Sequence, residues 1–298
     1  MWFRNLQSFK FTEQFTMAPE KLAEELQNYA FREVRPGEQL SRGFVSPQGE
    51  ENSPLVHAAN GFMLICLRTE EKIVPTSVVR EKLMERIEAL EARESRKIYK
   101  KEKDRLKDDV FYELLGRAFS RNSRLYACID VREGALWVDA ASSTKAEILT
   151  TELRRAIGTL KIELPKVKEV PLILTDWIQS KTLPESFSAL DSFVVEDKKT
   201  GGVIRGQKQA IFSEEIQSLM DGSRSVIQLA LSWRNLVSFV LKDDFSIRSL
   251  KFLQDVKAQS SDIFTETPAQ RFDADFTIMT ETLREFWADL YGVFRAYE

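Results

Sequence analysis

The chain has 298 residues and a mass of 34.4 kDa, enough for two average domains or one large one. Its 43 Lys and Arg against 46 Asp and Glu leave a net charge of −3, which by itself argues against a nucleic-acid-binding protein, because such domains are usually basic. Apolar runs fall short of the roughly 18 residues that a membrane helix needs, and the N-terminus lacks the layout of a signal peptide. The single histidine, His57, excludes a multi-histidine metal site, and Cys66 and Cys128 lie in apolar runs that predict buried thiols in a reducing cytoplasm.

The N-terminal part is predicted to be a small α/β unit. Residues 2–11 are aromatic-rich and partly alternating, which is typical of a strand, and Pro19 opens a helix at its favoured first position. Residues 35–54 are punctuated by proline and glycine and are predicted to be mainly loop. Asn60-Gly61 separates two apolar runs, which predicts a tight hairpin.

The next segment is helical in character. Residues 77–107 contain no glycine or proline, and an apolar stripe at helical spacing runs along their first half. One helix over this range would be about 45 Å long at 1.5 Å per residue. Its second half is too polar to be packed on all sides. We therefore expect it to project from the body or to pair with residues 110–119 as a helical hairpin.

The middle of the chain returns to mixed structure. Glu133-Gly134 is predicted to join two strands as a hairpin, and residues 144–160 to form a helix that begins with a Thr-x-x-Glu capping box. Residues 172–174 have the composition of a strand, and residues 175–180 that of a short helix.

The C-terminal part repeats the alternation of strands and helices. Strands are predicted at 191–196, 202–205, 226–232 and 235–242, and one or more closing helices at 269–291. The order of hairpins and helices predicts an α+β (mixed α/β) chain with antiparallel sheets, a projecting helical arm and a C-terminal α/β part.

The near-zero net charge conceals local asymmetry. Residues 93–107 hold eight basic and three acidic residues, a net charge of +5, whereas residues 261–298 hold eight acids and three bases, a net charge of −5. Three arginines surround Phe119 with no acid among them, and residues 198–210 hold four basic residues and no acid. A solvated helix with balanced ion pairs is the ordinary explanation of a charge run, but these runs have one sign. A basic arm with one exposed aromatic suits phosphate contact and base stacking.

The candidate enzyme motifs are weak. Residues 201–208 are glycine-punctuated and basic but lack the Gly-Lys-Ser/Thr ending of a nucleotide-binding loop. Asp273 and Asp275 lie in sequence of helical character, where positions two apart diverge, and an acidic first turn of a helix explains them better than a metal site. Asp191 with Glu196 matches a nuclease pattern only loosely. No constellation meets the test of an active site, so we expect no enzyme activity, metal or cofactor.

Several strings, in order along nearly the whole chain, resemble the RdgC family of bacterial recombination-associated proteins. The strings are Met-Trp-Phe-Arg-Asn-Leu at 1–6, His-x-Ala-Asn-Gly at 57–61, Glu-Glu-Lys-Ile-Val-Pro at 70–75, Glu-Lys-Asp-x-Leu-Lys-Asp at 102–108, Arg-Ala-Phe-Ser-Arg at 117–121, Gly-Gly-Val-Ile-Arg at 201–205, Lys-Gln at 208–209, Ser-Glu-Glu-Ile at 213–216, Leu-Lys-Phe at 250–252 and Ala-Gln-Arg-Phe-Asp-Ala-Asp-Phe at 269–276.

The resemblance implies a ring-shaped homodimer whose hole admits duplex DNA, without marked sequence preference and without enzyme activity. It implies antagonism of RecA in recombination, a location on the nucleoid in the cytoplasm, and no membrane partner. Single-stranded DNA is an open second partner. Residues 1–74 with 122–165 would form the central domain, 75–121 the tip arm and 166–298 the base, with contacts at tip and base closing the ring.

The basic stretches and the family's Lys-Gln pair together define the candidate DNA-binding residues. They are Arg96, Lys97, Lys100, Lys101, Lys103, Arg117, Phe119, Arg121, Arg205, Lys208 and Gln209. The resemblance places Phe119 at the end of the tip. The family's loop is more basic just before the Lys-Gln pair, where this chain has Gly206-Gln207.

Two other functions are weighed against a DNA-encircling ring. One is a metal-dependent nuclease that uses Asp273 with Asp275, or Asp191 with Glu196. The other is a protein-interaction module whose basic arm binds an acidic partner.

Overall fold

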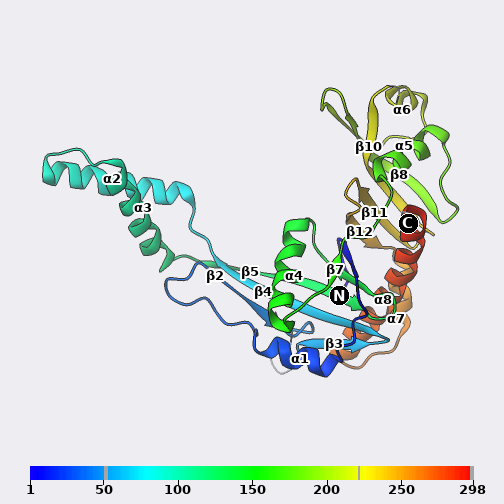
Figure 1. Cartoon of the computed structure of the whole chain (residues 1–298), viewed down its shortest axis with the longest axis horizontal. Helices are drawn as coiled ribbons and strands as arrows, with labels where there is room; N and C mark the ends of the chain where they lie inside the picture. The colour runs from blue at the N-terminus through cyan, green and yellow to red at the C-terminus, as the bar shows by residue number, and fades with distance from the viewer. Residues whose placement is uncertain (50–52, 221, 296–298) are drawn as a thin grey trace.

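The computed structural model describes residues 1–49, 53–220 and 222–295, and within them the chain forms twelve strands and eight helices. Two antiparallel sheets make the α+β architecture that the sequence predicted. In outline the molecule is a broad U, with a helical arm on one side and the C-terminal sheet on the other (Figure 1). Among the described residues, no helix is long and apolar enough to cross a membrane.

The first sheet has seven antiparallel strands, in the order β2-β4-β5-β6-β1-β7, with β3 paired to β4. Its strands are β1 (Gln7–Phe11), β2 (Leu40–Val45), β3 (Val56–Ala59), β4 (Phe62–Lys72), β5 (Ser120–Asp130), β6 (Ala135–Val138) and β7 (Ile162–Glu163). The hairpins at Asn60-Gly61 and Glu133-Gly134 are confirmed, and both residues of the first turn have positive φ, 51° and 81°, as a primed turn requires.

Two details of this sheet go beyond the prediction. Residues 35–54 are rich in loop, as predicted, but they also contain β2, which pairs along six positions with β4; residues 50–52 lie outside the described part. Backbone hydrogen bonds to β4 hold β2 as a strand, although proline and glycine residues that favour turns stand on either side of it. The helix predicted from Thr144 begins earlier, at α4 (Ser143–Ile157), where the Ser142 hydroxyl accepts the Lys145 N–H at 3.4 Å in place of the predicted capping box.

One face of the first sheet is covered by α1 (Pro19–Gln27), which starts at the predicted proline, and by α4. Leu22 and Leu26 of α1 and Leu149 and Leu153 of α4 are fully buried against it. The prediction that both segments form helices is therefore confirmed.

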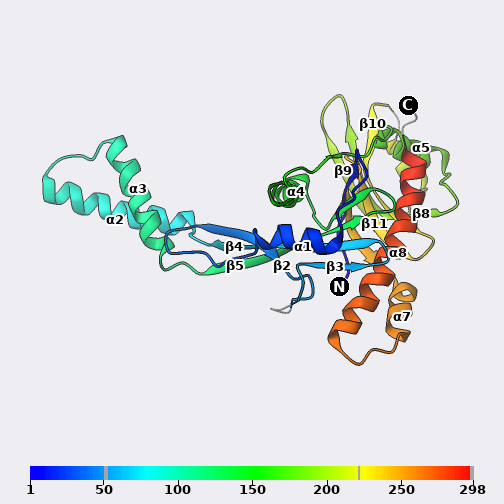
Figure 2. The same ribbon diagram turned by 60° about the horizontal axis from the view of Figure 1, so that its bottom comes forward.

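The segment expected to be one helix of about 30 residues is two helices, α2 (Thr76–Glu94) and α3 (Lys100–Leu115), so that prediction is wrong. The chain turns at Ser95, which adopts the left-handed conformation with φ 52°. Ile98 is buried in the turn, and the burial of its side chain stabilises the break between the two helices. The segment does project as a helical hairpin, as the alternative predicted, but its turn lies between α2 and α3 and not just before residue 110 (Figure 2).

The second sheet has five antiparallel strands, in the order β12-β11-β10-β8-β9. They are β8 (Phe187–Asp197), β9 (Val203–Gln207), β10 (Arg224–Trp233), β11 (Val237–Lys242) and β12 (Ile247–Phe252), and their helices are α5 (Val170–Ser180), α6 (Glu214–Leu219), α7 (Gln254–Asp262) and α8 (Pro268–Phe294). The strand predicted at 172–174 is wrong: Pro171 sits in the first turn of α5, where proline favours a helix start.

The long helix α8 connects the two sheets. One hydrophobic core contains Phe62, Leu64 and Trp137 from the first sheet together with Phe276 and Phe286 from α8. A bidentate ion pair joins Arg284 of α8 to the buried Asp130 of β5, at 2.8 and 3.0 Å. Packing and charge therefore fix the second sheet relative to the first.

Candidate nucleic-acid interface

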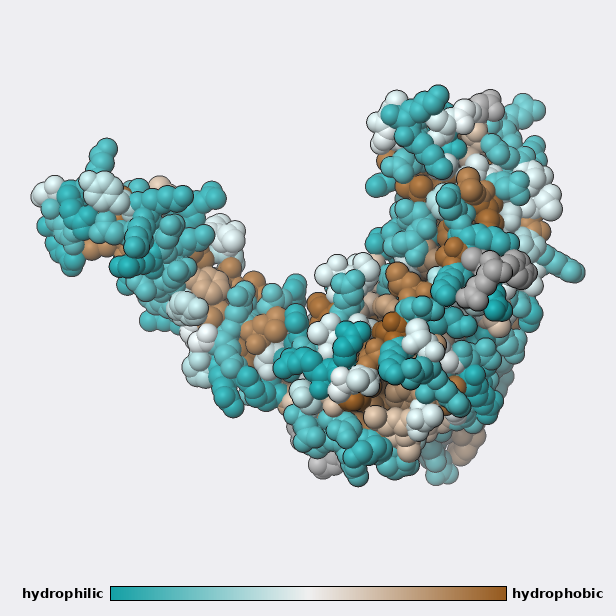
Figure 3. Space-filling view, in the orientation of Figure 1, coloured by the Kyte–Doolittle hydropathy of each residue, from teal (hydrophilic) through white to brown (hydrophobic). Residues whose placement is uncertain are grey.

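The predicted DNA-binding residues fall into three groups on the two sides of the U. The space-filling view shows a wide hollow between the arm and the C-terminal sheet (Figure 3). The first group lies in the turn at the outer end of the arm and on the start of α3. The second lies where α3 returns to β5, and the third on β9 and the loop after it.

Arg96 in the arm turn is held by acids of its own chain. Its guanidinium contacts Glu94 at 2.8 Å and forms a bidentate pair with Glu102 at 2.8 and 3.0 Å. Hydrogen bonding to Arg96 lowers the pKa of Glu102 to about 2. Glu102 also accepts the Tyr99 N–H at 3.1 Å, so this pair closes the turn into α3. Arg96 therefore has a structural role in the arm, and its charge is less available to a phosphate than that of an unpaired lysine.

The lysines around this turn are free cations. Lys97, Lys100, Lys101 and Lys103 are exposed, and among the described residues none of them has a carboxylate partner. On a helix, positions 100 and 103 lie on neighbouring sides of one face, so their ammonium groups form a short positive strip. Unpaired surface ammonium groups are the kind that can neutralise phosphates and release counterions.

Phe119 lies at the foot of the arm, not at its end as the resemblance implied. Its carbonyl accepts the Ile73 N–H at 2.9 Å, which anchors it beside the sheet, while the outer end of the arm carries Tyr99. Its side chain is nevertheless 90% exposed, the largest value of any bulky apolar residue described. A ring this exposed is available for stacking, and it is no part of the core.

The two arginines beside Phe119 differ in availability. Arg121 stands opposite Glu71 in the β4–β5 register and pairs with it at 3.1 Å. Arg117 is exposed and has no ion pair within the described residues. Of the two, Arg117 is the free cation at this position.

The third group lies on β9, the outermost strand of the C-terminal sheet, on the side that faces the arm (Figure 2). Arg205 and Lys208 are exposed without an ion pair in the described part of the chain. Lys208 has a positive φ of 55°, and the Gln209 N–H donates to the Asp191 carbonyl at 3.2 Å, which fixes the turn and leaves the Gln209 side chain exposed.

Gly206 explains why this loop is less basic than the resemblance would suggest. The ring of Phe193, itself 2% exposed, crosses β9 at this glycine, and a Cβ there would lie 2.2 Å from its Cε1 atom. A lysine or arginine at position 206 is incompatible with the Phe193 ring in this place.

Sequence reasoning missed a further basic element, α4, which stands between the arm and the C-terminal sheet in both ribbon views. Its side away from the sheet exposes Lys145 and Arg154, for which the described residues contain no ion-pair partner, whereas Arg155 is paired with Glu152 at 2.9 Å. The sequence indicates that these basic residues are exposed positions of a helix. Only the fold shows that this helix borders the hollow between the arm and the C-terminal sheet.

The carboxylates weighed for a nuclease are not gathered in one place. Asp273 and Asp275 are both on α8, but Asp273 pairs with His57 at 3.2 Å, whereas Asp275 contacts the N-terminal amine at 3.0 Å and the Ser260 hydroxyl at 2.6 Å. The described residues contain no group of three or more His, Cys, Asp or Glu that could hold a metal ion.

The two thiols are also unsuited to chemistry. Both are buried and free, as the sequence predicted. Burial raises the pKa of Cys66 to about 12 and that of Cys128 well above its usual value. Neither thiol forms the thiolate that a nucleophile needs at neutral pH.

Comparison with known proteins identifies the family of this chain. A family model described as "Putative exonuclease, RdgC" matches residues 1–297. The recombination-associated protein RdgC of Aeromonas hydrophila subsp. hydrophila is 40% identical over 295 residues, which cover 98% of this chain and 97% of the relative. The proteins of the same name from Yersinia pestis and Yersinia pseudotuberculosis are 39% identical over 289 residues, 95% of this chain and 94% of each relative. The relatives' names state no enzyme activity, although the family description includes an exonuclease. The chain belongs to the RdgC family of bacterial recombination-associated proteins.

Proposed function

We propose that this protein is a non-enzymatic, sequence-independent DNA-binding protein that encircles duplex DNA as a ring-shaped homodimer and opposes RecA in recombination. The observation that supports the proposal is that exposed cations without an ion-pair partner among the described residues occur on each of the three elements that border one hollow, the arm, α4 and the C-terminal sheet (Figures 1 and 3). They are Lys97, Lys100, Lys101, Lys103 and Arg117 on the arm, Lys145 and Arg154 on α4, and Arg205 and Lys208 on the C-terminal sheet.

A two-fold symmetric pair of U-shaped subunits would close around the hollow, with contacts at the arm and at the C-terminal base. Each cation would then occur twice around the hole. Exposed apolar side chains on the arm, Met84 at 55% and Tyr112 at 61%, suit a contact with the partner's arm. The dimer would have twice the 34.4 kDa mass of one chain.

Binding would be dominated by phosphate contacts, because lysine and arginine on a smooth channel neutralise charge without reading base edges. Encirclement adds a topological component: the ring can slide off a linear duplex but must open to leave a closed circle. A ring that occupies duplex DNA would obstruct RecA filaments there. Such a protein would reside on the nucleoid in the cytoplasm and need no cofactor.

The salt dependence of duplex affinity tests the phosphate contacts. We expect log Kd to change linearly with log salt concentration, and changing Lys100, Lys101 and Lys103 together to Gln to reduce the slope by about 2 to 3 for each subunit, since each phosphate contact contributes about 0.9. The matched control changes Lys21, Lys82 and Lys161 to Gln, because these three lysines are ion-paired at 3.1, 2.8 and 2.6 Å. Equal effects of the two triple variants would contradict the proposed surface.

Two further measurements separate the competing functions. A protein that dissociates from linear but not from closed circular duplex at high salt is a ring, and a strictly monomeric mass with and without DNA contradicts that. Incubation of plasmid with the protein and Mg²⁺ or Mn²⁺ tests the nuclease alternative. Intact plasmid, together with slowed RecA strand exchange, is the expected outcome.

A further inference from the structure

A cavity of about 730 Å³ lies between the two helices of the arm, which the structure describes throughout. The lining includes three residues from each helix: Val79, Arg80 and Leu83 from α2, and Lys107, Asp108 and Phe111 from α3. The cavity therefore combines aliphatic, aromatic and charged side chains in one place.

The apolar part of the cavity consists of side chains that the hairpin packing only partly covers. Val79 is buried, whereas Leu83 and Phe111 are half-buried. Among the described residues no aromatic ring is stacked on Phe111, whose ring contact is with Tyr112, edge-on at 5.8 Å. An aromatic ring without a stacking partner thus stands beside two aliphatic side chains.

The rim of the cavity is positively charged. Arg80 on α2 and Lys107 on α3 are both exposed, and neither has an ion-pair partner within the described part of the chain. Asp108 is the single acid among these lining residues, so the cations outnumber it. Because Arg80 and Lys107 are unpaired, they would lose no protein partner on binding a phosphate.

A stripe of lysines leads along α3 to this cavity. Lys100, Lys103 and Lys107 recur at spacings of three and four residues, which places them on one side of the helix. Phe111 continues the same spacing on that side. From Lys100 to Lys107 the helix rises by about 10 Å at 1.5 Å per residue. Asp104 lies on this side as well, but the three lysines keep the stripe positive.

We propose that the cavity holds one unpaired base of a single-stranded nucleic acid, stacked on Phe111, with its neighbouring phosphates at Arg80, at Lys107 and along the lysine stripe. Single-strand sites combine cations that follow the phosphates with aromatic rings on which bases stack. Ligand cavities enclose about 300 to 1,000 Å³, and this one falls within that range.

The unpaired state of the base follows from the same chemistry. Every base carries an N–H donor on its pairing edge, which the Asp108 carboxylate can accept only when the base is not paired, and which gives no sequence preference. A base inside a duplex is stacked and paired, so it cannot enter the cavity. The ligand therefore differs from the encircled duplex, and the site does not depend on closure of the proposed ring.

The test compares two probes on the full-length protein by fluorescence anisotropy: a short oligothymidylate, and an abasic strand with the same number of phosphates. We expect the oligothymidylate to bind at least about fivefold more tightly, because only it can stack a base. Equal affinity of the two strands would overturn the proposal.

The variant Phe111→Leu assigns the preference to this cavity, since leucine keeps an apolar side chain but has no ring. We expect it to bind both strands with the affinity that the unaltered protein shows for the abasic one. A preference that survives in Phe111→Leu would refute the site.

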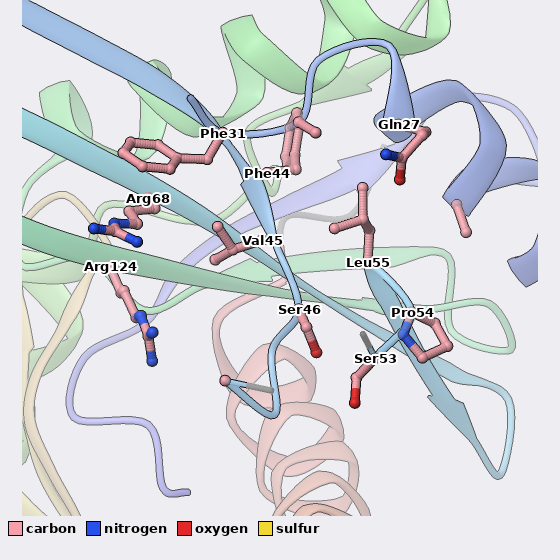
Figure 4. Close-up of a pocket in the computed structure, with 13 residues that line it drawn as sticks. Gln27, Phe31, Phe44, Val45, Ser46, Ser53, Pro54, Leu55, Arg68 and Arg124 are labelled. Carbon is pink, nitrogen blue, oxygen red and sulfur yellow. The ribbon is translucent and has the colours of Figure 1, made fainter. Parts of the chain in front are cut away.

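The exposed Arg80 gives a second variant that leaves the packing of the arm intact. Arg80→Gln should weaken both strands and lower the salt slope by about 0.7, the share of one phosphate contact in a single strand. The matched control is Arg68→Gln on β4, because Arg68 is already engaged by the Phe31 ring at 4.2 Å and by Asn122 Oδ1 at 3.0 Å (Figure 4). Equal effects of the two variants would overturn the assignment to the arm.

Duplex affinity and mass, measured on Phe111→Leu, keep this proposal separate from the proposed ring. We expect both to stay unchanged. Parallel loss of duplex and single-strand binding would overturn a base site, since Phe111 would then act through the shape of the arm. A change from dimer to monomer would also overturn it, because the cavity would then be a contact between subunits. Absence of duplex binding in the unaltered protein would count against the ring alone.

Discussion

At the scale of single residues, Gly206 determines the shape of the β9 edge. Because a Cβ there would lie 2.2 Å from the Phe193 ring, we expect Gly206→Ala to destabilise the protein by about 1 to 3 kcal/mol through overpacking. Urea unfolding of the full chain measures the change. Gly292→Ala in α8 is the control, since a Cβ there meets no atom within 4 Å and should stabilise by up to about 1 kcal/mol. Equal stability of the two variants would show that Phe193 moves freely.

Charge counting picked out the basic segments but could not distinguish free from ion-paired residues within them. Arg96 and Arg121 look equivalent to Lys97 and Arg117 in the sequence, yet both are ion-paired. The partner of Arg121 is fifty residues away, and only the strand register reveals it. The exposure of Phe119 matched the hypothesis of a stacking residue, but its position at the foot of the arm did not.

At the scale of elements, the contact between β3 and α8 depends on the sole histidine. His57 packs edge-on against Phe272 and Phe276 and pairs with Asp273, all three on α8. Burial lowers the pKa of His57 below its usual 6.5, and the nearby Asp273 only partly opposes this. The unfolded chain therefore binds a proton at a higher pH than the folded protein does.

We expect the stability to be fully present above pH 6.5 and to fall as the pH falls from 6.5 toward the lower pKa of the folded protein. Urea unfolding at a series of pH values between 5.5 and 7.5 measures this dependence. His57→Gln should flatten the curve in that window, because no other histidine is present. A variant curve parallel to that of the unaltered protein would contradict the assignment.

Helix and strand boundaries show where local patterns stop being informative. The hairpins were predictable, since a glycine after a polar residue favours the positive φ values that a tight hairpin turn needs. The break between α2 and α3 was not, because Ser95 takes a positive φ that its residue type rarely adopts. Likewise β2 owes its existence to pairing with β4, a contact distant in sequence.

At the scale of the whole molecule, the hollow depends on how the two sheets are held. Sequence reasoning, aided by the family resemblance, anticipated a projecting arm and a separate base, and the division into three domains stays a prediction. What it could not supply was the side on which α4 stands or which strand borders the hollow. Both follow from the packing of α8 across the two sheets, which has no local sequence signature.

The Asp130–Arg284 pair is the polar part of that packing. Because it joins the first sheet to α8, it affects both the stability of the protein and the width of the hollow. Asp130 is completely buried and its carboxylate also accepts the Arg132 and Glu133 N–H groups at 3.0 and 3.2 Å. Asp130→Asn keeps an acceptor for the turn but leaves Arg284 with only the exposed Glu281 at 3.1 Å as a carboxylate partner, so we expect a loss of up to about 3 to 5 kcal/mol in urea unfolding.

The double variant Asp130→Asn, Arg284→Met distinguishes an uncompensated charge from lost packing. Arg284 also lies over the Phe62 ring at 3.9 Å, a place that a methionine thioether can fill. We expect the double variant to regain a substantial part of the stability that the single variant loses, because no buried charge remains. Duplex affinity should follow the same order, since the angle between the sheets sets the width of the hollow. If the double variant is no more stable than the single one, the pair acts through shape alone and its charge is irrelevant to holding the two sheets.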